Sequence, residues 1–180
     1  MSVPAGRRKQ SRFEARHSYY RLRDEVTALM LQDFGFSREK YQKQIEKYRK
    51  SHKNAQNVDE IVQKMIKKCD SFHKWFIDKE CDAVLGILRE IETQFTQGNS
   101  IYPSDTPAGL SEYCERRRHI NEAIGLCYAL KQELNYIIRT LPVDINKYTR
   151  FDEMINKQIA LYKGVRQSDN RLIKKIRGNL

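Results

Sequence analysis

Apolar residues recur at intervals of three and four along most of this chain, the spacing that places side chains on one face of an α-helix. The cleanest pattern lies between residues 110 and 141, where each such step from position 120 reaches an apolar residue. The positions are Ile120, Ala123, Cys127, Leu130, Leu134, Ile138 and Leu141. This pattern predicts a helix over 110–141 that Pro142 brings to an end.

Three further stretches share this periodicity. A first helix is predicted over 12–33 and ends at Phe34-Gly35-Phe36. Its apolar face comprises Tyr19, Leu22, Val26, Leu29 and Met30. A second is predicted over 72–97, stopped by Gly98-Asn99 and followed by a loop over 101–109. Its wide apolar face comprises Phe72, Trp75, Phe76, Val84, Leu88, Ile91 and Phe95. A third, over 145–166, is capped by Asp144.

Residues 38–69 are richer in lysine and poorer in apolar residues than their neighbours. Ser37 is placed to cap a polar helix over 38–50, and Asn57-x-x-Glu60 resembles the start of another. The segment therefore reads as an insertion. The sequence predicts an all-α protein, an antiparallel four-helix bundle over 12–168 with a helical insertion at 38–69 between the first and second core helices. A basic flexible arm over 1–11 and a basic C-terminal tail over 169–180 flank the bundle.

The composition agrees with one helical domain, because charged residues make up 32% of the 180 positions and only 12 are Gly or Pro. No apolar run approaches the roughly 20 residues that a membrane span needs, and no signal-peptide stretch follows Met1. Cys69, Cys81, Cys114 and Cys127 form no C-x-x-C pair and lie beside apolar residues. We expect reduced core thiols in a cytoplasmic protein.

The net charge of +11 equals the excess of basic residues at the two ends of the chain. Residues 1–23 hold seven basic side chains and one acid, and residues 163–180 hold six and one. Residues 24–162 contain 21 of each sign. Two cationic ends predict a polyanionic partner, of which nucleic acid is the commonest, because neutralised phosphates release condensed counterions.

No strong catalytic signature is present, whether a Gly-rich phosphate loop, a zinc-protease helix or a hydrolase nucleophile motif. The histidines are scattered over separate elements, and we expect neither cofactor nor metal. Arg12-x4-His17 matches the spacing of a motif found in helical HEPN-type ribonucleases. A metal-independent ribonuclease that uses Arg12 and His17 is therefore an alternative. A purely structural, protein-binding bundle is another.

Arg116-Arg117-Arg118-His119 is the densest basic cluster, and arginine is suited to bidentate phosphate contact. On a helix its side chains wrap one end of the bundle. The nearby tyrosines could stack on unpaired bases, although aromatics at helical spacing more often lie in a core. They are Tyr19, Tyr20, Tyr102 and Tyr113.

Four segments follow one another along the chain: Ser2-Val3-Pro4-x-x-Arg7, Gly98-Asn99-Ser100-Ile101-Tyr102, Tyr113-x-Glu115-Arg116-Arg117-Arg118 and Lys163-Gly164-x-Arg166-x-Ser168-Asp169. Their ordered combination resembles the accessory variability determinants of diversity-generating retroelements. The resemblance covers residues 1–36 and about 72–172. The bundle proteins encoded in the intervening sequences of ribosomal RNA are a related family. The insertion at 38–69 departs from the shorter family bundle.

This resemblance implies a basic homopentamer that binds a reverse transcriptase and its template RNA and supports mutagenic cDNA synthesis without performing chemistry. The side chains expected to hold nucleic acid or acidic polymerase surface come from both ends and from the arginine cluster. They are Arg7, Arg8, Lys9, Arg12, Arg16, Arg116, Arg117, Arg118, Arg166, Arg171, Lys174 and Lys175.

Overall fold

The computed structural model describes residues 12–53, 57–71, 74–104 and 106–178, and all regular structure in these ranges is helical. The elements in chain order are α1 (Arg12–Met30), η2 (Asp33–Gly35), α2 (Arg38–Ser51), α3 (Val58–Ser71), α4 (Lys74–Ser100), η3 (Pro107–Gly109), α5 (Leu110–Thr140) and α6 (Ile145–Gly178). The α elements are α-helices and the η elements are short 3-10 turns. The all-α prediction is confirmed.

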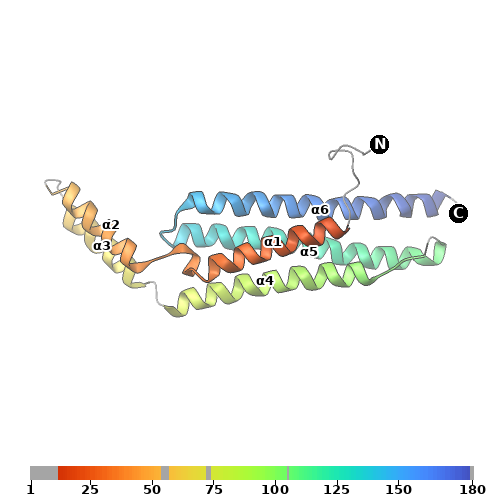
Figure 1. Cartoon of the computed structure of the whole chain (residues 1–180), viewed down its shortest axis with the longest axis horizontal. Helices are drawn as coiled ribbons and strands as arrows, with labels where there is room; N and C mark the ends of the chain where they lie inside the picture. Colours follow the sequence, from red (N-terminus) through yellow and green to blue (C-terminus); the bar gives the residue numbers. More distant parts are fainter. Residues whose placement is uncertain (1–11, 54–56, 72–73, 105, 179–180) are drawn as a thin grey trace.

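Four long helices share the main core. α4 packs along α5, α5 packs along α6, and α1 lies against both α4 and α6 (Figure 1). α2 and α3 pack on each other as a hairpin that projects from one end of the molecule, and α6 ends at the opposite end (Figure 1). The interior contains aromatic contacts such as the stack of Phe95 on Tyr162, whose ring centroids lie 4.7 Å apart.

The first helix is shorter than its apolar pattern predicts. α1 ends at Met30, and Asp33, Phe34 and Gly35 then adopt positive φ angles of 47°, 58° and 77°. Residues other than glycine rarely adopt this left-handed backbone conformation, so packing against neighbouring residues must hold the turn. Phe34 is fully buried, and its carbonyl accepts a 2.8 Å hydrogen bond from the Tyr148 hydroxyl of α6.

Gly98 does not stop the second long helix, contrary to the sequence-based expectation. α4 continues to Ser100, and Gly98 is buried where α4 meets α5. A Cβ atom at this position would lie 3.0 Å from the Cβ of His119 and 3.2 Å from the carbonyl oxygen of Arg116. The glycine therefore permits close approach of two helices.

α6, which the sequence predicts over 145–166, extends twelve residues beyond that predicted end, and most of the expected tail over 169–180 is helical. Its buried positions continue through Val165, Asp169, Ile173 and Ile176, at steps of four, four and three. Ile173 and Ile176 pack around Tyr113 of α5. The sequence pattern does not predict the longer helix, because Asp169 interrupts the series of apolar residues.

The predicted helix caps have different outcomes. The Ser37 hydroxyl accepts a hydrogen bond from the Lys40 backbone N–H at 3.3 Å, and an Asp144 carboxylate oxygen accepts one from the Asn146 N–H at 3.0 Å. Both caps are confirmed. Glu60 instead contacts Lys64, with a carboxylate oxygen 2.6 Å from the ammonium nitrogen. The expected capping box is thus not the interaction that Glu60 makes.

Two sets of expected core residues are corrected. Trp75, assigned to the apolar face of α4, is 67% exposed, and Phe72 lies outside the described residues. All four cysteines are free thiols, with Cys69 and Cys127 buried and Cys81 half-buried. Cys114 is exposed on α5 and is not a core thiol.

Candidate nucleic-acid interface

The predicted basic site residues that the structure describes lie mainly on α5 and α6. α5 begins in the half of the molecule where α6 ends, and α1 also begins in that half (Figure 1). The N-terminal arm over 1–11, with Arg7, Arg8 and Lys9, lies outside the described residues, as does the side chain of Arg12. The other predicted residues differ in the exposure of their side chains and in their partners.

Four of these side chains are exposed cations without an ion pair in the described part of the chain. They are Arg117 of α5 and Arg171, Lys174 and Lys175 of α6. Exposed cations that no carboxylate neutralises keep their full charge for an incoming anion. We call these four residues the distal basic cluster.

Three other predicted residues have partners or are less accessible. Arg118 forms an ion pair with Glu122 one helical turn away, at 2.7 Å, which offsets part of its charge. Arg166 donates a hydrogen bond to the neutral side-chain oxygen of Asn121 at 2.8 Å and keeps its net charge. Arg16 of α1 is half-buried.

Arg116 is a correction to the predicted interface. Its side chain is 4% exposed and forms a two-pronged ion pair with Asp169 of α6, itself 1% exposed. The Nε atom donates to one carboxylate oxygen at 2.9 Å, and the second prong reaches the other oxygen. A third donor contacts the Ile101 carbonyl at 3.3 Å. The guanidinium therefore supports the α5–α6 packing and is not available to phosphate.

His119 also faces inward, so the arginine cluster wraps the bundle end only in part. Its Nδ1 lies 2.7 Å from the side-chain oxygen of Gln94 on α4, and its Nε2 lies 3.1 Å from Arg118. Gln94 in turn donates to Glu90 at 2.7 Å. This chain of hydrogen bonds ties α4 to α5 next to Gly98.

The tyrosines divide between the core and the surface. Tyr19 and Tyr113 are buried and cannot stack on a base, whereas Tyr20 and Tyr102 are exposed. The structure adds Tyr128 of α5, which sequence reasoning did not select. Its hydroxyl accepts a 3.1 Å hydrogen bond from Lys163 of α6, and the residue is 45% exposed. In the sequence, position 128 falls between Cys127 and Leu130 of the apolar helical pattern, and this marks Tyr128 as a surface residue.

His17, the candidate ribonuclease base, lies in an open cleft of about 400 Å³ between α1 and α6. The lining also includes Glu14, Arg21, Glu153 and Lys157. The His17 ring packs edge-on against Phe13, with centroids 4.5 Å apart. The cleft mixes both charge signs.

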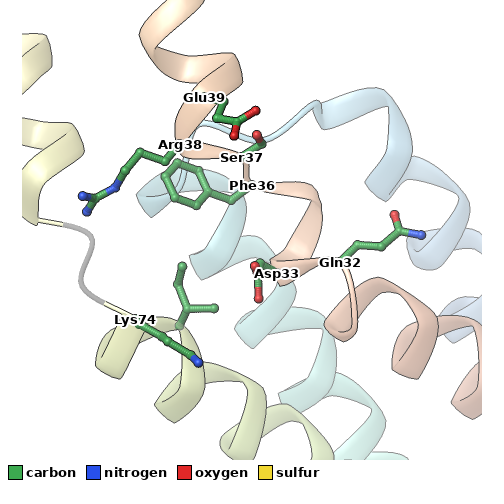
Figure 2. A pocket seen from close by; sticks show the side chains of 8 residues that line it. Gln32, Asp33, Phe36, Ser37, Arg38, Glu39 and Lys74 are labelled. Atoms are coloured by element: carbon green, nitrogen blue, oxygen red, sulfur yellow. The ribbon is translucent and has the colours of Figure 1, made fainter.

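A larger open cleft of about 800 Å³ lies where the hairpin joins the long helices. Its lining residues are Gln32, Asp33, Phe36, Ser37, Arg38, Glu39, Lys74 and Ile77. Figure 2 shows Arg38 extended toward α3 and away from Asp33. Arg38 lies 3.5 Å from the Cys69 carbonyl oxygen, at the limit of a hydrogen bond. Two cations and two carboxylates balance here, so the cleft has no preference for an anion.

Two of the cysteines, Cys81 and Cys127, have raised pKa values. Burial raises the pKa of the Cys127 thiol to about 12. Burial, with nearby carboxylates that include Asp33 and Asp78, raises the pKa of Cys81 to about 11. Both thiols are protonated at neutral pH, and a protonated thiol is a poor nucleophile.

Within the described ranges, no three His, Cys, Asp or Glu side chains gather where they could hold a metal ion. Among the helices of the same ranges, none is both long enough and apolar enough to cross a membrane. No protein-family model, curated protein or solved structure matches the chain.

Proposed function

We propose that this chain is a non-enzymatic, oligomeric RNA-binding protein that acts as an accessory factor of a reverse transcriptase. The observation that carries the proposal is the distal basic cluster of Arg117, Arg171, Lys174 and Lys175. Its four cations are exposed, unpaired with carboxylates among the described residues, and contributed by two packed helices. Arg166 and the Tyr128–Lys163 pair extend this surface along α5 and α6.

The architecture that we propose is an antiparallel four-helix bundle of α1, α4, α5 and α6, with α2 and α3 inserted between the first two. The pairwise packing of these helices supports it. So do contacts between helices: Arg116 pairs with Asp169, whereas Lys131, farther along α5, pairs with Asp152, earlier in α6. The partner on α6 lies earlier in the chain as the position on α5 lies later, which indicates that the two helices run antiparallel.

The specific partners that we propose are the reverse transcriptase and template RNA of a diversity-generating retroelement, in a homopentameric assembly. The support is the ordered resemblance that includes Gly98 to Tyr102 and Lys163 to Asp169. A reverse-transcriptase gene beside a pair of near-identical repeats in the same genome would support this partner. A neighbourhood without a reverse transcriptase would contradict it.

RNA binding is tested by titrating a labelled RNA stem–loop at several salt concentrations. Several phosphate contacts give a steep fall in affinity with salt, about 0.7–0.9 log units per log unit of salt for each contact. The variant with Arg171→Gln, Lys174→Gln and Lys175→Gln should reduce the slope by about two to three. A flat wild-type response would overturn RNA binding and favour the purely structural bundle.

The same assay tests the absence of catalysis. We expect the RNA to remain intact after prolonged incubation with the protein. Cleavage that disappears in the His17→Ala variant would overturn the non-enzymatic assignment and establish the ribonuclease alternative.

A further inference from the structure

The α2–α3 hairpin carries a concentrated positive charge. Residues 38–71 contain ten lysines and arginines and five acids, so this segment is strongly basic within a central region that balances as a whole. The hairpin projects from the end of the molecule opposite the end of α6 (Figure 1). It is therefore far from the distal basic cluster.

Four lysines of α2 form a row along one side of the helix. Lys40, Lys43, Lys47 and Lys50 follow one another at steps of three, four and three, and all four are exposed. Steps of three and four residues keep side chains on one face. With a rise of about 1.5 Å per residue, the row spans about 15 Å. One strand of duplex DNA presents a charge about every 3.4 Å of its axis, and on that scale the row can face about four phosphates.

The row retains its charge in the described structure. Glu39 and Glu46 precede Lys43 and Lys50 by one turn, a spacing that permits ion pairs. Among the described residues, neither carboxylate lies within 4.0 Å of a lysine in the row. By contrast, Lys64 on α3 is paired with Glu60 at 2.6 Å.

The opposite side of α2 is already occupied. Tyr41 and Ile45 are buried in the core cluster that also contains Val58 and Val62 of α3. A helix that inserts into the surface of a membrane needs a free apolar face beside its cationic one. Since the apolar face of α2 packs on α3, the lysine row lacks such an anchor, which favours a soluble polyanion over a lipid surface.

The base of the hairpin is anchored to the long helices. The left-handed turn at Asp33, Phe34 and Gly35 redirects the chain out of α1, and the buried Phe34 ring and the Tyr148 hydrogen bond hold the turn in place. A fixed base presents the lysine row in one direction and lowers the entropic cost of binding.

We propose that the α2–α3 hairpin is a second nucleic-acid-binding element, in which the lysine row contacts the phosphates of a duplex RNA backbone. This inference rests on the RNA binding proposed above and assigns a separate site to it. All four members are lysines, whose ammonium groups pair with phosphate as point charges, and the deep, narrow major groove of duplex RNA hides the base edges from side chains, so the contacts are with phosphate and independent of base sequence.

The test replaces the whole row, Lys40→Gln, Lys43→Gln, Lys47→Gln and Lys50→Gln, in the full chain. Glutamine is a good helix former, so α2 should persist, and circular dichroism checks this. The matched control removes the same charge from exposed positions on the long helices that form no ion pair among the described residues, with Lys79→Gln, Arg139→Gln, Lys147→Gln and Lys157→Gln. The probe is a labelled RNA stem–loop with a stem of about two helical turns, titrated at several salt concentrations.

We expect the row variant to reduce the salt slope of binding by about three, at 0.7–0.9 per lost contact, and the control to leave it nearly unchanged. If the wild type binds steeply and the row variant keeps the wild-type slope, the hairpin site is wrong and the proposed RNA binding stands. If the wild type does not bind RNA, both proposals fail. An unchanged RNA slope with loss of binding to phosphatidylserine vesicles would overturn the nucleic-acid site in favour of a membrane surface.

Discussion

At the scale of single residues, the pair of Arg116 and Asp169 illustrates how burial changes the role of a charge. A buried ion pair adds little net stability, because both ions lose their hydration. Removing one partner is nevertheless costly, because the remaining ion is then buried and poorly solvated. Arg116 also contacts the Ile101 carbonyl, and its guanidinium lies 5.6 Å from the centre of the Tyr113 ring. The pair therefore fixes the register of α5 on α6.

We predict that Arg116→Ala lowers the free energy of unfolding by about 3–5 kcal/mol, because it removes the guanidinium that pairs with the buried Asp169 carboxylate. Urea denaturation measures the loss. The neighbouring Arg117→Ala is the matched control, and its exposed position predicts a change within about 0.5 kcal/mol. Equal stability of the two variants would contradict the burial of Arg116.

The cysteines provide a second prediction at this scale. Cys114 is exposed and should react with a thiol reagent in the native protein, whereas Cys127 should react only after unfolding. Burial both shields the Cys127 sulfur and, by raising its pKa to about 12, keeps it protonated at neutral pH. Mass spectrometry of protein labelled with and without denaturant locates the modified thiols. Rapid native labelling of Cys127 would contradict the packing of α5.

Among the elements, periodicity predicts the existence of the helices but not all of their ends. The apolar stripe of α5 is visible in the sequence because its inward positions are apolar with few exceptions. In α6 the inward position 169 is an aspartate, and it is buried beside Arg116, an ion-pair partner 53 positions away that the local pattern does not reveal. In α4, Gly98 resembles a stop signal until its contact with α5 is known.

The helical glycines give a contrasting prediction. Gly86 of α4 is exposed, and an added Cβ would meet nothing within 4 Å, so Gly86→Ala should stabilise the protein by about 0.5–1 kcal/mol. Gly98→Ala should destabilise it, because the new Cβ would lie 3.2 Å from the rigid Arg116 carbonyl oxygen. Thermal midpoints of the two variants test this. A stabilising Gly98→Ala would show that α4 and α5 can move apart at little cost.

For the whole molecule, position along the chain is a poor guide to position in space. Summed along the sequence, residues 24–162 are neutral, which directs attention to the chain ends. In the fold, the basic hairpin is separated from the more acidic remainder of that region and projects from one end (Figure 1). The buried Arg116 and Asp169 contribute little to the outer field. The sequence therefore indicates a basic protein, and the fold shows where its exposed charges gather.

Assembly is the remaining property of the whole molecule, and the exposed apolar residues suggest where contacts form. Leu31 follows α1, Trp75 lies in the first turn of α4, and Ile145 begins α6. All three are largely exposed, and the helix ends that carry them lie at the hairpin end of the molecule (Figure 1). Large apolar side chains that are exposed in the protomer are candidates for burial in a protein interface.

We therefore predict that the protein forms a homo-oligomer, a pentamer if the family resemblance holds, through contacts that include Leu31 and Trp75. Light scattering at micromolar concentration should give five times the protomer mass of 21.4 kDa. The double variant Leu31→Asp and Trp75→Asp should dissociate it, because a ring is closed by repeats of one contact and charge at that contact is costly to bury. Both positions are solvent-exposed in the protomer, so the variant should still fold.

A wild-type mass of one protomer would exclude the oligomer, whereas a dimer or tetramer would retain assembly and exclude the pentamer. An intact ring in the double variant would place the interface elsewhere on the molecule.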